Sequence, residues 1–130
     1  RDRLPVTFAG FLNQAEIVRA YVAADCLVLP SDAGETWGLV VNEAMCCGLP
    51  AIVSDQVGCG PDLVEEGVTG AVYPAGDVDA LAKLLIACSA DGAGLRAMGA
   101  RARDRVETHY SVARATEGTL AAIDAAMAGT

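Results

Sequence analysis

Two short apolar runs constrain the fold most, because each is continuous rather than alternating. Residues 25–30 are DCLVLP and residues 50–54 are PAIVS, and unbroken apolar strands are typical of a parallel sheet that is buried on both faces. Similar runs at 5–9 and 71–73 bring the predicted strands to four. Helical patterns lie between them, so the order of elements predicts an α/β fold. We expect a Rossmann-like open parallel sheet with helices on both faces.

The helices are expected from the spacing of apolar residues and from the residues at their ends. Gly48 and Pro50 end one helix, and Asp77 and Ser111 are suitable N-caps. The expected helices are 13–24, 38–47, 62–66, 77–86, 93–107 and 112–128. The chain of 130 residues is therefore predicted to be one domain, with an α/β core over about 1–90 and C-terminal helices over about 91–130.

Composition excludes several classes of protein. The net charge of −8 argues against a nucleic-acid partner, because neutralising phosphates requires clustered Lys and Arg. No apolar run is long enough to span a membrane, and no signal peptide is recognisable, so a cytoplasmic protein is expected. Five cysteines without a C-x-x-C spacing suggest buried, reduced thiols and no metal site.

Basic residues are missing from the middle of the chain. No Lys, Arg or His occurs between Arg19 and Lys83. Two loops rich in Gly and small polar residues, 30–38 and 54–61, follow predicted strands in this region. Ligands bind at the carboxyl ends of parallel strands. An anion held there must be bound by backbone N–H groups, or by cations that come from elsewhere.

Glu35 and Glu43 lie eight positions apart on either side of an expected helix start. A helix beginning near Trp37 points its free N–H groups and positive dipole end at the strand ends, which makes a phosphate site without lysine. Gly38 permits close approach of a ligand, and Glu43 lies about 9 Å along the axis. Such a pair suits a ligand with hydroxyls at both ends and phosphates between. The alternative is that Glu35 only favours the helix dipole and Glu43 faces solvent.

Several ordered blocks carry a resemblance to a known family. They are Pro30-Ser31, Glu35 to Gly38, Asn42 to Met45, Gly48 to Pro50, Gly67 to Gly70 and Asp77. Together they resemble the C-terminal half of family 4 glycosyltransferases (group 1) of the GT-B fold, which are retaining enzymes of carbohydrate biosynthesis. Glu35 and Glu43 match the E-x7-E motif of that family. The resemblance implies part of a C-terminal GT-B domain with a helical C-terminus, which binds the nucleotide-sugar donor of a hexosyltransferase.

The resemblance also implies a role for each matching residue. Glu43 would hold the ribose of the donor, and Glu35, the catalytic candidate, would hold the donor sugar. The diphosphate would be held by the backbone of Trp37, Gly38 and Leu39. The base would be bordered by Phe11 and Leu12. No metal or other cofactor is expected.

Family members have further parts that these residues do not contain. They carry an N-terminal acceptor domain and an opening strand and loop whose Arg and Lys grip the diphosphate. We therefore expect a truncated domain that is inactive alone. A glycan, lipid or small-molecule acceptor, and any peripheral membrane contact, would involve only the missing domain. The alternative is a non-catalytic Rossmann-like domain that binds a nucleotide or a protein partner.

Overall fold

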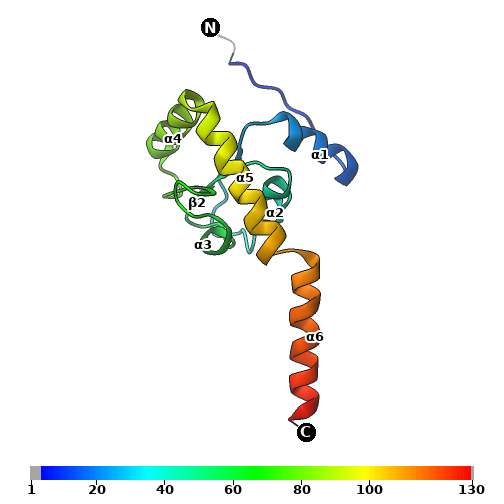
Figure 1. Ribbon diagram of the computed structural model, residues 1–130. Helices are drawn as coiled ribbons and strands as arrows, with labels where there is room; N and C mark the ends of the chain where they lie inside the picture. The colour runs from blue at the N-terminus through cyan, green and yellow to red at the C-terminus, as the bar shows by residue number, and fades with distance from the viewer. Residues whose placement is uncertain (1–3, 130) are drawn as a thin grey trace.

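The computed structural model describes residues 4–129 and has an α/β body around a parallel sheet (Figure 1). The three strands are β1 (Leu27–Leu29), β2 (Ala51–Ser54) and β3 (Gly70–Tyr73), in the spatial order β1-β2-β3. Both neighbouring pairs are parallel. The predicted fold class, an open parallel sheet with helices, is confirmed.

Six helices surround or extend this sheet within the described residues. They are α1 (Gln14–Ala23), α2 (Leu39–Cys46), α3 (Gly60–Leu63), α4 (Val78–Ala90), α5 (Gly92–His109) and α6 (Val112–Ala128). Side chains cap the N-termini as expected, with Asp77 accepting from Ala80 N–H and Ser111 accepting from Arg114 N–H. Figure 1 shows α6 projecting from the body as a separate rod. Across residues 4–129, no helix combines the length and hydropathy of a membrane-spanning segment.

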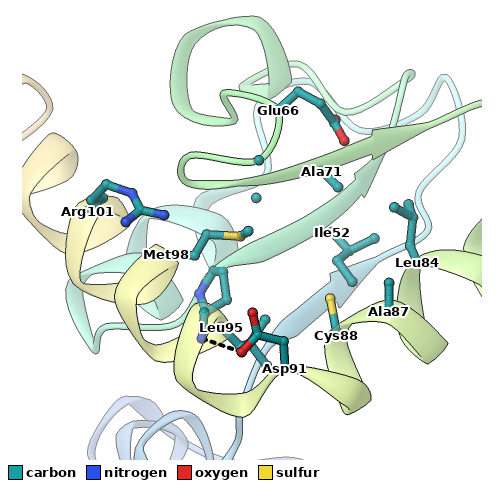
Figure 2. Close-up of a pocket in the computed structure, with 14 residues that line it drawn as sticks. Ile52, Glu66, Ala71, Leu84, Ala87, Cys88, Asp91, Leu95, Met98 and Arg101 are labelled. Carbon is teal, nitrogen blue, oxygen red and sulfur yellow. Dashed lines mark hydrogen bonds between the residues drawn. The ribbon is translucent and has the colours of Figure 1, made fainter.

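The middle strand is covered on both faces, which explains its continuous apolar sequence. Ala51 and Val53 are fully buried in a core with residues of α2 and α5. Ile52 points to the opposite face, where it lines a cavity with Leu84 and Cys88 of α4 (Figure 2). Successive residues of a strand alternate between faces, so β2 is apolar throughout because helices lie on both sides.

The predicted strand at 5–9 is wrong. This segment has no regular structure, and Val6 and Phe8 are 61% and 93% exposed. A strand needs a neighbour that shares its backbone hydrogen bonds, and in the described part of the chain no strand lies beside this segment. Its apolar character is therefore not sufficient to place it in the sheet.

The expectation that the cysteines are buried is correct only for Cys59. All five thiols are free, but Cys46 is exposed, and Cys26, Cys47 and Cys88 are half-buried. Cys46 lies in the last turn of α2, whose buried residues are Val41, Ala44 and Met45. The apolar sequence around each cysteine did not reveal whether its side chain would face the core or solvent.

Candidate functional site

Two loops meet at the carboxyl ends of β1 and β2. The loop over 30–38 leaves β1, and the loop that begins at Asp55 leaves β2. The hydroxyl of Ser54, at the buried end of β2, donates a hydrogen bond to the carbonyl of Ser31. The two loops are thus tied together where the strands end.

A close backbone contact joins the same loops farther from the sheet. The N–H of Cys59 donates to the carbonyl of Trp37 at 2.8 Å. At Gly58 an added Cβ would lie 1.9 Å from the carbonyl oxygen of Thr36. Only glycine allows this approach, so the loop after β2 supports the chain directly before α2.

Helix α2 begins at Leu39, whereas the sequence predicts a start near Trp37. Gly38 is the N-cap, with φ at 91°, and an added Cβ there would lie 3.1 Å from a methyl of Leu29. No described residue accepts a hydrogen bond from the N–H groups of Leu39 and Val40. These two donors and the positive end of the helix dipole are therefore available to an anion. Glu43 is the fifth residue of α2, about 6 Å along the axis from its start.

Glu43 is exposed, so its carboxylate is not buried in the apolar core. One of its oxygens, Oε2, accepts a hydrogen bond from the phenol of Tyr21 at 3.0 Å. Tyr21 is buried in α1, with 7% of its surface exposed. Within residues 4–129 this is the only hydrogen bond to the Glu43 carboxylate, which leaves Oε1 free to accept others.

The Tyr21 phenol is held in its protonated form. Burial, the hydrogen bond to Glu43 and the negative charge of Glu43 together raise the pKa of Tyr21 to about 12. The phenol therefore remains a hydrogen-bond donor throughout the neutral range. It fixes the position of the Glu43 carboxylate relative to α1.

We expect Tyr21→Phe to change the response of the protein to alkaline pH. The pKa of Tyr21 is about 12 when folded and about 10 when unfolded. Its stabilising contribution is therefore complete below pH 10 and is lost as the pH rises from about 10 to about 12. Urea unfolding across this window should show a smaller loss of stability in Tyr21→Phe than in the wild type. Equal losses of stability in the two proteins would contradict the contribution assigned to the Tyr21–Glu43 pair.

Glu43 lines a hollow of about 600 Å³ together with Phe11 and Leu12. The other walls come from the first turns of α1, over 13–17. Phe11 is 92% exposed, so its ring is available for contact with a ligand. The structure thus places the predicted base-bordering residues beside the predicted ribose partner.

The remaining candidate residues lie outside this hollow. Trp37 and Leu39 line a separate groove of about 670 Å³ between α2 and α6. Glu35 is half-buried in the loop before α2, and no hydrogen bond or ion pair to its carboxylate is found among residues 4–129. The seven candidates therefore surround the start of α2, but they do not share one cavity.

Sequence reasoning did not assign site roles to two side chains that position the candidates. Asn42 accepts a hydrogen bond from Trp37 Nε1 at 2.8 Å, which fixes the indole beside the first turn of α2. Tyr21 positions Glu43 from a different helix. The five-residue spacing of Trp37 and Asn42 was a local signal, whereas the Tyr21–Glu43 contact joins residues far apart in the sequence.

Basic side chains from outside the gap between Arg19 and Lys83 lie near this region. His109 and Arg114, near the junction of α5 and α6, line the same groove as Trp37 and Leu39. Arg114 also pairs with Glu117 at 2.9 Å. Among the described residues no three His, Cys, Asp or Glu side chains are grouped so that they could hold a metal ion.

Comparisons with known proteins give a consistent result. The profile of the family described as "Glycosyl transferases group 1" matches residues 4–105. Sulfoquinovosyl transferase SQD2 of Arabidopsis thaliana is 37% identical over 109 residues, which is 82% of this chain and 21% of that protein. Sucrose-phosphate synthase from Thermosynechococcus elongatus has a TM-score of 0.80 and 33% identity, over 95% of this chain and 31% of that one.

A further solved structure is the C-terminal domain of the group 1 glycosyl transferase LpcC from Francisella tularensis. Its TM-score is 0.73 at 25% identity, over 81% of this chain and 53% of that one. The chain thus spans about a fifth of SQD2, about a third of sucrose-phosphate synthase and about half of the isolated LpcC domain.

Proposed function

The chain belongs to the glycosyl transferases of group 1, as part of the C-terminal domain of a GT-B fold, and we propose that it binds the donor of a retaining hexosyltransferase. The donor would be a nucleoside-diphosphate sugar, and the acceptor a glycan, a lipid or a small molecule. The chain spans 21% of SQD2 and 31% of sucrose-phosphate synthase. The proposal therefore assigns acceptor binding to residues outside it, and these 130 residues alone are not expected to transfer sugar.

One observation carries the proposal. Two carboxylates, Glu35 before α2 and Glu43 within it, lie on either side of a helix start whose first N–H groups have no acceptor among the described residues. This helix start lies at the carboxyl ends of β1 and β2, where ligands bind to open parallel sheets. A nucleotide sugar has hydroxyls at each end and a diphosphate between them, and so matches this order of groups.

Each part of the donor has a chemically suitable partner. The diphosphate accepts hydrogen bonds from the N–H groups of Leu39 and Val40 and interacts with the helix dipole. The ribose hydroxyls donate to Glu43, whose Oε1 is free, with the base over Phe11 and Leu12. The donor sugar lies toward Glu35.

The proposed reaction needs no carboxylate nucleophile from this chain. The bond between the anomeric carbon and the phosphate oxygen breaks, and negative charge develops on the departing diphosphate. Donors at the start of α2 stabilise that charge because they are already oriented toward it. Retention then depends on how the sugar and the acceptor hydroxyl are positioned.

The proposal is tested by titrating the full-length protein with UDP, GDP and ADP in a calorimeter. We expect at least one of them to bind, and Glu43→Gln to weaken that binding by about 10- to 100-fold, because hydrogen bonds to a charged group are lost. The introduced glutamine is close in size to the wild-type glutamate, and its side-chain carbonyl can still accept from Tyr21. Glu43→Ala removes the acceptor entirely and should weaken binding at least as much.

Glu107→Gln provides a matched control. Glu107 is an exposed glutamate on α5 that pairs with Arg103. It lines neither the hollow of Glu43 nor the groove of Trp37 and Leu39, so its substitution should leave nucleotide affinity unchanged. Equal affinity of the wild type and both Glu43 variants would contradict the ribose assignment. Failure of all three nucleotides to bind would favour a non-catalytic domain that binds a protein partner.

A further inference from the structure

Two half-buried thiols lie near the amino ends of the strands, at the opposite end of the sheet from the proposed donor site. A cavity of about 320 Å³ lies between β2, β3, α4 and α5, and Cys88 of α4 is part of its wall (Figure 2). A second cavity of about 260 Å³ is lined by both Cys88 and Cys26. Cys88 therefore borders both cavities, and it shares the second with Cys26.

The register of the sheet independently places Cys26 on the face that Cys88 covers. Val28 of β1 is aligned with Ile52 of β2, and Ile52 and Cys88 line the same cavity (Figure 2). Cys26 precedes Val28 by two residues, and side chains two apart in an extended segment point to the same face. Cys26 thus points toward the α4 side of the sheet.

The direction of α4 brings the two thiols to the same end of the sheet. Helix α4 follows β3 after a short loop and runs back along the sheet, as helices in parallel α/β folds do. Its last turns, which contain Cys88, therefore reach the amino ends of the strands, where Cys26 lies just before β1. Burial, followed by the neighbouring Cys88, raises the pKa of the Cys26 thiol.

The other three thiols are poorly placed for pairing with one another. Cys46 and Cys47 are consecutive, so their Cα atoms are about 3.8 Å apart, which is shorter than the usual distance across a disulfide, about 4.4–6.8 Å. Cys59 is fully buried, with its sulfur 3.8 Å from the carbonyl oxygen of Gly38. Oxidation should therefore select the pair of Cys26 and Cys88.

We propose that Cys26 and Cys88 form an intramolecular disulfide when the protein reacts with hydrogen peroxide. The thiolate of one cysteine attacks the peroxide and becomes a sulfenic acid, with release of hydroxide. The second thiol displaces that oxygen as water and completes the S–S bond. Two thiols lose two electrons, and the peroxide is reduced to two waters. Because the thiolate is the reactive form, the reaction accelerates as the pH rises.

The disulfide would link α4 covalently to the segment before β1. No residue of α4 is buried, so few contacts retain its C-terminal half against the sheet. A crosslink to the residue before β1 closes a long loop and reduces the freedom of the unfolded chain. We expect oxidation to raise the Tm by about 5–10 °C.

Peptide mapping of the full-length protein tests the proposal directly. The protein is oxidised with hydrogen peroxide, alkylated and cleaved before its aspartates. This cleavage separates Cys26 in peptide 25–31, Cys88 in peptide 79–90, Cys59 in peptide 55–61, and Cys46 with Cys47 in peptide 32–54. We expect peptides 25–31 and 79–90 to be joined, and the joined species to disappear after reduction with dithiothreitol.

Variants distinguish this pair from the alternatives. Cys26→Ser and Cys88→Ser should each abolish both the joined peptides and the rise in Tm, whereas Cys46→Ser should retain both. A disulfide between any other two cysteines, a disulfide-linked dimer, or full alkylation of Cys26 and Cys88 after oxidation would overturn the proposal. If a serine variant fails to fold, the wild type still decides, because its Tm shift must be reversed by dithiothreitol.

Discussion

Replacing Glu35 with glutamine in the full-length protein should lower kcat/KM for the proposed sugar transfer by about 100-fold and leave the affinity for free nucleoside diphosphate unchanged. Glu35 lies in the loop before α2, on the opposite side of the helix start from Glu43. In the proposed function it contacts only the donor sugar. Misplacing the reacting sugar by about 1 Å is sufficient for a loss of that size. A free nucleoside diphosphate lacks the donor sugar that Glu35 would contact, so its affinity should not change.

Substitutions of the two glutamates are therefore expected to change different measured quantities. Glu43→Gln should weaken nucleoside diphosphate binding, and Glu35→Gln should lower the transfer rate with that binding intact. Calorimetry with the nucleoside diphosphate and steady-state transfer assays separate the two effects, with Glu107→Gln as a control for both. If Glu35→Gln weakens the diphosphate complex as much as Glu43→Gln does, then Glu35 does not lie at the sugar end.

Local signals in the sequence were sufficient for most of the fold. The apolar runs of β1 and β2 and the capping residues Asp77 and Ser111 each act over a few neighbouring positions. Such short-range preferences can be recognised without knowing the tertiary structure. All six helices accordingly begin within two residues of their predicted starts, and three of the four predicted strands are present.

The failures occur where a distant partner decides the outcome. The segment 5–9 has strand-like residues, but a strand also requires a neighbour. At the start of α2, the left-handed N-cap Gly38 lies against Leu29 and Val57. That contact depends on how two loops pack and leaves no local signal.

In the candidate site, too, local features could be predicted from the sequence and contacts between distant residues could not. The eight-residue spacing of Glu35 and Glu43 can be seen in the sequence, and it correctly places one residue before α2 and the other within it. The hydrogen bond between Tyr21 and Glu43, by contrast, spans two helices. The sequence around Tyr21 does not predict which group its phenol contacts.

Gly58→Ala should destabilise the protein by about 3 kcal/mol, at the upper end of the usual cost of overpacking. Gly58 is exposed, and substitutions at exposed positions usually change stability by less than about 0.5 kcal/mol. The reason for the larger effect is the 1.9 Å separation between an added Cβ and the carbonyl oxygen of Thr36. A backbone oxygen cannot rotate away, so the loop before α2 must move as a whole.

Gly118→Ala is the matched control, because it makes the same chemical change without the contact. Gly118 lies within α6, and an added Cβ there would meet no atom within 4 Å. Alanine favours a helix over glycine by about 0.5–1 kcal/mol, so this variant should be slightly more stable. Urea unfolding of both variants measures the difference, and a Gly58→Ala protein within about 0.5 kcal/mol of the wild type would contradict the steric argument.

The Gly58 variant also connects the fold to the proposed site. The N–H of Cys59, the next residue, donates to the carbonyl of Trp37, directly before the N-cap of α2. Moving this loop displaces the first N–H groups of the helix, which are the proposed partners of the diphosphate. Nucleotide affinity should therefore fall in Gly58→Ala under conditions where the variant is still folded. A folded Gly58→Ala protein with wild-type affinity would show that the start of α2 does not contact the diphosphate.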